Sequence, residues 1–496
     1  MQGAPHVSRV FAVCSRTFVR QIQARIGPKV ALPSSRCDQS WPPLWKLPVI
    51  DPHYCGGQLP GHDLTKRRSC RSLAEILSRP NSDQIVVWSA MERSLAVLIR
   101  ELAFSDHKMA LVSGPRQCGK TTLGKMLLDD RKVGAYHNWD DVSFRRVWTK
   151  EPAAVTAGLT TSSVVPLVVL DEIHKARGWK RTLKGMYDTR EQLFDLIVTG
   201  SAGLNVYKKG GDSLLGRALH FHLHPFSVAE LAAVSLPSEP DERIGALFAH
   251  ATTPAKEDPI APLLRYGGFP EPFLSANERK ARVWRRSRIE KVLREDLRDL
   301  SRIPELSRVE MLASLLPERV GSPLSRASLR EDLEVSFDSV ARWLGLLAEL
   351  YYTFELKPYT RSVSRSLKRE SKLYLWDWSE VQDPGARFEN LVAVHLRKAC
   401  DFWTDSGEGT FDLRYLRNKE KEEIDFLIVR DGKPWLPVEA KLSDTEPLRH
   451  WRKFLGQLGC RRAVQLVSKP GCFRMYTEGG IELVVASAGD AFTYFV

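Results

Sequence analysis

With 496 residues, of which 43% are hydrophobic, the chain is long enough for about three domains with their own cores, which excludes a small disulfide-held scaffold. Its eight cysteines include no C-x-x-C pair, so the sequence predicts neither a zinc site nor a disulfide framework, and a reduced, cytoplasmic setting fits best. Because no apolar run reaches the roughly 18 residues of a membrane span, we expect no membrane partner.

The net charge of +13 is unevenly distributed along the chain. Residues 1–70 carry ten Lys or Arg and three Asp or Glu, so +7 lies there and +6 in the remainder. This distribution indicates a basic N-terminal segment more than a basic binding surface. Residues 1–75 are rich in Pro, Arg and Ser without a helix or strand period, so we expect a largely disordered extension.

Residues 76–107 have apolar side chains every three or four positions, which is typical of helix. They lead into the stretch 109–128, where Gly114, Gly119, Lys120 and Thr121 match the pattern G-x-x-x-x-G-K-[ST] between an expected strand and an expected helix. In such a loop the backbone N–H groups converge on a polyphosphate, Lys120 reaches the β and γ phosphates, and the Thr121 hydroxyl binds Mg²⁺. The alternative is a glycine-containing turn that only matches a short pattern.

The loop therefore predicts two cofactors, ATP and Mg²⁺. The residues expected to hold the nucleotide are Gly114, Pro115, Arg116, Gln117, Cys118, Gly119, Lys120, Thr121 and Thr122.

Residues 164–172 form an almost continuous apolar run that ends in two carboxylates, Asp171 and Glu172, as a buried parallel strand with a polar end would. We expect Asp171 to hold Mg²⁺ and Glu172 to orient or deprotonate the attacking water. The alternative is an acidic turn in solvent. We favour the functional interpretation, because ligands of α/β sheets bind at the carboxyl ends of strands.

The next expected strand, 194–198, ends near Thr199 and Ser201. Either hydroxyl could contact the γ-phosphate region, although a simple Ser/Gly turn explains them equally well. Arg217 precedes another expected strand and could stabilise transition-state charge in its own or a neighbouring subunit, or be an ordinary surface cation. His220, His222 and His224 alternate, which favours a polar strand face over a metal site.

Several motifs resemble a widespread prokaryotic family that joins an AAA-type ATPase core to a C-terminal domain of unknown function, number 4143. The resemblance covers about residue 90 to the end, through GPRQCGKTT, VVLDEIHK, VTGS, LLGR, HPFSVAEL and YGGFPEP. It implies ATP binding and an α/β core, here assigned to residues 76–235, and implies little about biological role.

Residues 236–310 are expected to be helical, with basic and acidic side chains mixed on solvent-facing surfaces. Residues 311–376 predict a winged helix: two amphipathic helices separated by a turn at 335–338, then two strands around a basic loop. The basic side chains of that wing are Lys357, Arg361, Arg365, Lys368, Arg369 and Lys372. The wing could contact DNA, or the module could pack against protein.

Residues 377–496 carry a second constellation. Glu389 lies on an expected helix, and Asp425 is followed by Glu439 and Lys441 across an expected hairpin, a D…E-x-K spacing that resembles the restriction-endonuclease-like fold. Paired carboxylates can bind Mg²⁺ for phosphodiester cleavage. Glu422, Glu423 and Asp444 are alternative carboxylates, and an exposed amphipathic hairpin is the simpler interpretation.

The sequence thus predicts an α/β P-loop NTPase with a parallel sheet, a helical and winged-helix middle, and an α/β restriction-endonuclease-like end. The expected function is Mg²⁺-dependent ATP hydrolysis in a nucleotide-driven switch on or near DNA, with Lys120, Glu172 and Arg217 as catalytic residues. The alternatives are an ATPase that controls a protein partner through a catalytically silent nuclease-like end, and an ATP-regulated DNA nuclease. Assembly into a homo-oligomer is compatible with each.

Overall fold

The computed structural model describes residues 93–159, 164–200, 214–232, 239–250, 259–297, 305–360, 370–418, 420 and 422–496. All of them lie within the compact unit Arg68–Val496. The expected extension 1–75 and the candidate hydroxyl of Ser201 fall outside the described residues.

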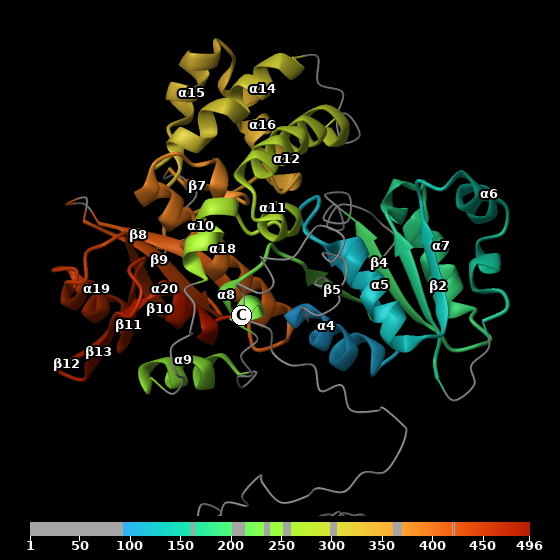
Figure 1. The fold of residues 1–496 in the computed structure, drawn as a ribbon, viewed down its shortest axis with the longest axis horizontal. Helices are drawn as coiled ribbons and strands as arrows, with labels where there is room; N and C mark the ends of the chain where they lie inside the picture. Colours follow the sequence, from blue (N-terminus) through green and yellow to red (C-terminus); the bar gives the residue numbers. More distant parts are fainter. Residues whose placement is uncertain are drawn as a thin grey trace, which may run out of the picture. The chain divides into compact units, whose positions relative to one another are not determined.

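The first part of the described chain contains a parallel sheet of five strands in the order β2-β3-β4-β1-β5. Figure 1 labels β2, β4 and β5 of this sheet. The three inner strands are buried at every residue, which explains why their sequences are continuous apolar runs. The strands are β1 (Met109–Ser113), β2 (Gly134–Asn138), β3 (Leu167–Asp171), β4 (Asp195–Gly200) and β5 (Ala218–His222).

Alternate residues of these strands belong to two hydrophobic cores on opposite faces of the sheet. Val112 packs in the core that contains Leu123 of α5, whereas Leu111 packs in the core that contains Trp148 of α6 and Leu183 of α7. The predicted α/β class with a parallel sheet is confirmed. The helical elements of this part are α4 (Ser94–Leu98), η3 (Ile99–Phe104), α5 (Lys120–Arg131), α6 (Val142–Lys150), η4 (Pro152–Thr156), η5 (Ile173–Lys175), α7 (Trp179–Asp188) and α8 (Val228–Ala232).

The described residues between 239 and 350 are mainly helical. Ser325 caps α15 and Ser336 caps α16 through side-chain hydrogen bonds, so the second helix begins within the stretch 335–338 predicted as a turn. The elements are α9 (Pro240–Phe248), α10 (Ile260–Tyr266), α11 (Pro270–Ser275), α12 (Glu278–Lys291), η7 (Val292–Asp296), α14 (Leu306–Leu315), η8 (Leu316–Arg319), α15 (Arg326–Leu333) and α16 (Phe337–Glu349).

A two-stranded antiparallel sheet follows these helices, formed by β6 (Thr353–Leu356) and β7 (Lys372–Leu375). Four of the six wing cations, Arg361, Arg365, Lys368 and Arg369, lie outside the described residues, so DNA contact by the wing stays a prediction. Lys372 was wrongly assigned to the basic loop. It is the first residue of β7 and only 1% exposed, so it is not available to phosphate groups.

The C-terminal part is built on a mixed sheet of six strands in the order β12-β13-β11-β10-β9-β8. Its long helix α18 begins at a proline and is capped by Asp383, whose side chain accepts a hydrogen bond from the Ala386 N–H. The elements are η9 (Trp378–Glu380), α18 (Pro384–Asp405), β8 (Phe411–Arg417), β9 (Glu423–Arg430), β10 (Lys433–Lys441), α19 (Trp451–Leu458), β11 (Arg462–Val467), β12 (Phe473–Glu478), β13 (Ile481–Ser487), α20 (Ala488–Ala491) and η10 (Phe492–Tyr494). The restriction-endonuclease-like assignment stays a prediction.

Over the described part of the chain, none of the helices combines the length and the apolar character needed to cross a membrane.

Candidate functional site

The loop between β1 and α5 has the backbone geometry that its glycines predict. Gly119, which precedes α5, has a φ of +103°, a left-handed conformation that glycine adopts without a Cβ clash. A Cβ on Gly114 would lie 2.1 Å from the Leu223 carbonyl oxygen. The loop therefore approaches the segment after β5 so closely that a side chain at Gly114 is excluded.

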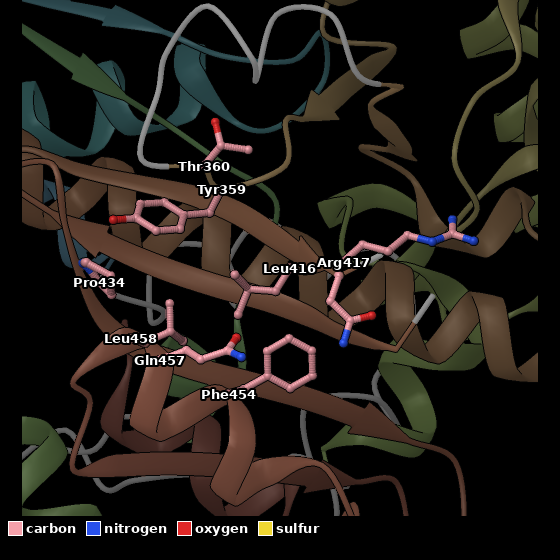
Figure 2. Close-up of a pocket in the computed structure, with 9 residues that line it drawn as sticks. Tyr359, Thr360, Leu416, Arg417, Pro434, Phe454, Gln457 and Leu458 are labelled. Carbon is pink, nitrogen blue, oxygen red and sulfur yellow. The ribbon is translucent and has the colours of Figure 1, made fainter. Parts of the chain in front are cut away.

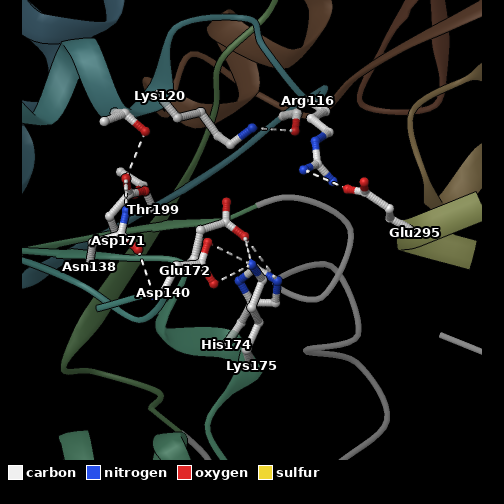
Figure 3. A network of polar contacts seen from close by, with 12 residues as sticks. Arg116, Lys120, Asn138, Asp140, Asp171, Glu172, His174, Lys175, Thr199 and Glu295 are labelled. Carbon is white, nitrogen blue, oxygen red and sulfur yellow. Dashed lines mark hydrogen bonds and ion pairs between the residues drawn. The ribbon is translucent and has the colours of Figure 1, made fainter. Parts of the chain in front are cut away.

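The Lys120 side chain points back into this loop (Figure 3). Its Nζ donates hydrogen bonds to the carbonyl oxygens of Gly114, at 3.0 Å, and Pro115, at 2.7 Å, and the residue is 6% exposed. Both partners are neutral backbone groups. A phosphate would offer this ammonium a stronger, charge-assisted hydrogen bond.

Asp171, at the end of β3, is the centre of a hydrogen-bond network. One carboxylate oxygen accepts from the Thr121 hydroxyl at 2.7 Å and from the Tyr136 hydroxyl at 2.9 Å. The same oxygen accepts from Asn138 at 3.3 Å, and the other accepts from the buried hydroxyl of Thr199. The network brings the two expected Mg²⁺ ligands, Thr121 and Asp171, into direct contact at the carboxyl edge of the sheet.

Two of these partners, Tyr136 and Asn138, were missed in the sequence. They occupy alternate positions of β2, and Asn138 is in register with Asp171, so both side chains reach the same edge of the sheet. Burial, together with the nearby Asp171 carboxylate, raises the pKa of Tyr136 to about 12, although its hydrogen bond with Asn138 opposes the shift. The signal available in the sequence was the alternation of Tyr136 and Asn138, two polar residues two positions apart.

Glu172 has a φ of +58°, an uncommon conformation for a residue other than glycine. Its N–H donates to the Thr199 carbonyl at 2.9 Å, which anchors the turn to β4. Its carboxylate lies 3.5 Å from the Lys175 ammonium and 3.7 Å from His174 Nε2 (Figure 3). The Glu172 carboxylate therefore lies beside Lys175 and His174, just past the carboxyl end of β3.

The remaining residues of the loop contact other parts of the chain. Arg116 pairs with Glu295 of η7 at 3.3 Å, and the Cys118 thiol donates to the Leu223 carbonyl at 3.5 Å. Gln117 lies in the loop with a φ of +64°, and Thr122 lies in the first turn of α5. The loop is thus connected to the helical segment as well as to the sheet.

A buried chain of charges runs from this loop to α18. The Arg93 guanidinium donates to the Cys118 carbonyl at 3.1 Å and to the Glu230 carboxylate at 2.8 Å. Glu230 also accepts from Lys398 of α18 at 2.5 Å. Burial would raise the pKa of Glu230, but Arg93 and Lys398 lower it to about 2. Arg93 lies too far from the loop in sequence for any local pattern to have indicated this contact.

Arg217 is not brought to the loop. It directly precedes β5, which is parallel to β1, so it lies at the amino edge of the sheet, whereas the loop follows the carboxyl end of β1. There it forms a two-pronged pair with Asp188, at 2.6 and 3.0 Å. A catalytic role within its own subunit does not fit this position, and a role in a neighbouring subunit stays a prediction.

Two of the alternating histidines, His222 and His224, lie against α18. His222 Nδ1 lies 3.0 Å from Asp405, and His224 Nε2 lies 3.0 Å from Asp401. Burial lowers the pKa of His224 to about 4, against the opposing effect of Asp401. These pairs add to the contact between β5 and α18.

The C-terminal constellation comes together around one ammonium group. Glu389 of α18 and Asp425 of β9 both approach Lys372 Nζ, at 3.2 and 3.4 Å, and Glu423 also forms an ion pair with it. Glu439 accepts hydrogen bonds from the Asp425 N–H at 3.1 Å and from Lys441 Nζ at 2.6 Å. The structure thus places all four predicted residues in one cluster, which we call the carboxylate cluster, and adds Lys372 to it.

Burial dominates the acidity of this cluster. It raises the pKa of Glu389 and of Glu439 to about 7, in each case with help from the negative charge of Asp425. Burial would lower the pKa of Lys372, but the surrounding carboxylates of Glu389, Asp425 and Glu423 raise it instead. Lys372 is therefore a charged ammonium group. The alternative carboxylates Glu422 and Asp444 take other partners, Glu422 with Lys453 at 2.5 Å and Asp444 with the Glu446 N–H at 2.9 Å.

A separate cavity of about 500 Å³ lies between Tyr359, β8 and α19 (Figure 2). Phe454 and Gln457 of α19 line it together with Leu416 and Arg417 of β8. None of the predicted site residues contributes to it, so this cavity is distinct from both sites described above.

Comparison with known families divides the chain into three matched segments. Residues 106–232 match the AAA domain, residues 258–380 match a domain of unknown function (DUF8612), and residues 384–487 match a domain of unknown function (DUF4143). The expected combination of an AAA domain with domain 4143 is confirmed. The middle segment is similar to one family across both the helical and the winged-helix-like parts proposed for it.

Among curated proteins, the chain is similar to an uncharacterized protein of Mycobacterium bovis and one of Mycobacterium tuberculosis. Each is 21% identical over 361 residues, which cover 70% of this chain and 73% of the relative.

Among solved structures, a chain described under "Structural Basis for Katanin Self-Assembly" is 16% identical, with a TM-score of 0.21, and covers 55% of this chain and 84% of its own length. The protein PCH-2 of C. elegans is 14% identical, also with a TM-score of 0.21, and covers 56% of this chain and 70% of its own.

Proposed function

We propose that this chain binds ATP with Mg²⁺ in the loop between β1 and α5 and hydrolyses it, as a nucleotide-driven switch. The main support for the proposal is the contact between the Thr121 hydroxyl and the Asp171 carboxylate, which are 2.7 Å apart. Thr121 directly follows Lys120, whose ammonium group points into the same loop. The match of residues 106–232 to the AAA domain supports the same assignment.

The residues at this edge suit Mg²⁺, which prefers oxygen ligands and usually binds one or two protein groups together with substrate phosphates. Thr121 and Asp171 would supply a hydroxyl and a carboxylate oxygen, and the bound ion would neutralise charge on the phosphates. The hydrogen bonds from Tyr136, Asn138 and Thr199 fix the orientation of the Asp171 carboxylate.

The chain's own residues perform the remaining steps. Lys120 exchanges its two backbone carbonyl partners for the β and γ phosphates. Glu172 orients the attacking water and accepts its proton, and the nearby Lys175 and His174 hold its carboxylate in place before the nucleotide arrives. Hydrolysis then changes the charge held by the loop, and the contacts of the loop with Arg93 and Glu295 carry that change to other parts of the chain.

The test is the Glu172→Gln variant, which keeps the shape of the side chain and removes its basicity. We expect ATP affinity, measured by calorimetry, to stay within about twofold and turnover to fall by at least about 100-fold, because a positioned general base contributes about 10²–10⁴ in rate. Glu191→Gln, an exposed position after α7, is the matched control and should turn over ATP normally. Normal turnover by Glu172→Gln would remove Glu172 from the mechanism.

A nuclease function for the C-terminal domain lacks such support, because the site expected to bind its metal already contains the Lys372 ammonium.

A further inference from the structure

The carboxylate cluster of the C-terminal domain surrounds the Lys372 ammonium on three sides. An ammonium has three N–H donors and no acceptor. Here its partners are three carboxylates, those of Glu389, Glu423 and Asp425. The number of charged acceptors therefore equals the number of donors, so the cation is fully satisfied by the chain itself.

The carboxylate oxygens near this ammonium are also engaged by other donors. Glu389 accepts a hydrogen bond from the Tyr374 hydroxyl at 2.7 Å. The Asp425 oxygen that does not face Lys372 accepts from the Ala440 N–H at 3.1 Å. Both oxygens of Glu439 are taken, one by the Asp425 N–H and one by Lys441. A metal ion would have to displace these donors before it could bind.

The ammonium has little freedom to leave. Lys372 is 1% exposed, begins the strand β7 that pairs with β6, and lies 5.7 Å from the centre of the Tyr415 ring. Gly321 packs against Glu389, since an added Cβ there would meet a Glu389 carboxylate oxygen at 2.9 Å. The ammonium is therefore buried, although the side chains of Glu389, Glu423 and Asp425 around it keep 14–24% of their surface exposed.

We propose that the Lys372 ammonium takes the place of a divalent cation in this domain, so that the carboxylate cluster is a permanent metal-free charge core and not a nuclease centre. Mg²⁺ needs near-octahedral oxygen ligands at about 2.1 Å, which would bring a double positive charge against the ammonium that shares those oxygens. Within the described residues, moreover, no group of three or more His, Cys, Asp or Glu side chains is arranged to hold a metal ion. The metal site expected at Glu389, Asp425 and Glu439 thus does not fit Mg²⁺.

A consequence is that the C-terminal domain acts through binding or packing. The role of the ammonium resembles that of the cation in a metal-stabilised fold, since it compensates buried negative charge. A domain of this kind can respond to the nucleotide state of the AAA domain without cleaving a phosphodiester.

The test compares Mn²⁺ binding and DNA cleavage by the full-length protein and its Asp425→Asn variant. Mn²⁺ is titrated without nucleotide and followed by electron paramagnetic resonance, and plasmid cleavage is assayed in Mn²⁺ or Mg²⁺. We expect the two proteins to bind the same amount of Mn²⁺ and to leave the plasmid intact. A Mn²⁺ site that disappears in Asp425→Asn, or cleavage that depends on Asp425, would overturn the proposal.

A second variant tests the ammonium itself. Lys372→Met keeps an unbranched side chain of nearly the same length but removes the charge, and Lys433→Met, at the exposed start of β10, is the matched control. We expect Lys372→Met to bind Mn²⁺ at least about tenfold more tightly than the wild type does, and the gain to vanish in the double variant with Asp425→Asn. A folded Lys372→Met protein without this gain would contradict the proposal. If Lys372→Met does not fold, the comparison of wild type with Asp425→Asn still decides.

Discussion

Two buried lysines of the chain, Lys120 and Lys372, lie near acidic residues, but the partners of their ammonium groups differ. Lys120 Nζ donates to the backbone carbonyls of Gly114 and Pro115, and the nearby Asp171 is occupied by hydroxyl and amide donors. Lys372 Nζ is enclosed by three carboxylates. The first ammonium has neutral partners that a phosphate can replace, whereas the second already has the anions it needs.

This difference distinguishes a site whose cation can bind an external anion from a site whose cation is already paired with carboxylates of the chain. A buried cation with neutral partners gains energy when an anion arrives, because charge-assisted hydrogen bonds are the stronger ones. A buried cation among carboxylates is already neutralised, and removing it leaves unpaired negative charge in the protein interior. The same residue type therefore indicates ligand binding in the AAA domain and structural charge compensation in the C-terminal domain.

The largest expected effect comes from breaking the second site. Lys372→Ala should lower the free energy of unfolding by about 3–5 kcal/mol, since it removes one partner of a buried charge cluster. Urea unfolding followed by circular dichroism measures this. Lys433→Ala, at an exposed position, should stay within about 0.5 kcal/mol of the wild type. Equal stability of both variants would mean that Lys372 carries no structural charge.

Removing the first lysine should affect binding instead of stability. Lys120→Ala should weaken ATP binding by at least about 100-fold, because hydrogen bonds to charged groups contribute about 1.5–3 kcal/mol each and Lys120 reaches two phosphates. Calorimetric titration with ATP in magnesium buffer provides the measurement. The exposed Lys184→Ala on α7 is the control and should bind ATP as the wild type does. A Lys120→Ala protein with unchanged affinity would exclude this loop as the nucleotide site.

Low pH should weaken the ion pairs of Glu230 with Arg93 and with Lys398 of α18. Its pKa is lowered from 4.5 to about 2 in the folded chain, so its stabilising effect is complete above about pH 4.5 and is lost as the pH falls toward 2. The loss is on the order of 2 kcal/mol. Urea unfolding at several pH values should show a shallower decline in Glu230→Gln than in the wild type, with the exposed Glu242→Gln as control. Parallel curves for the wild type and Glu230→Gln would show that Glu230 does not titrate in this range.

The smallest expected effect concerns the strand that leads into the nucleotide loop. The Tyr351 hydroxyl donates to the Ser113 hydroxyl at 3.0 Å, and both groups are buried. Tyr351→Phe should cost about 1 kcal/mol of unfolding free energy, the usual contribution of one hydrogen bond. Tyr359→Phe serves as the matched control and should change stability less. A larger loss of unfolding free energy in Tyr359→Phe would show that the hydrogen bond between Tyr351 and Ser113 does not stabilise the strand before the loop.

The sequence was most informative where function depends on neighbouring positions. Gly114 to Thr121 and the pair Asp171–Glu172 could be identified because a phosphate loop and a strand ending in carboxylates have local patterns, and the structure places them at one edge of the sheet. The D…E-x-K spacing likewise predicted that Asp425, Glu439 and Lys441 would come together. Parallel strands and hairpins bring such positions together by their own geometry.

Contacts between distant segments could not be predicted in the same way. Arg93 reaches the loop at Cys118 from another element, and Lys398 reaches Glu230 from α18. Lys372 was misassigned because five other cations and the strand-like flanks made it resemble one end of a basic wing. Only the tertiary fold shows that its side chain turns inward to three carboxylates.

The most direct test of the account is a count of tightly bound Mn²⁺ on the full-length protein with and without ATP, by electron paramagnetic resonance. We predict that ATP adds a tightly bound Mn²⁺ ion to the wild type and none to Lys120→Ala, and that Asp425→Asn behaves as the wild type does. The absence of ATP-dependent Mn²⁺ binding, or an ATP-independent ion that Asp425→Asn loses, would contradict it.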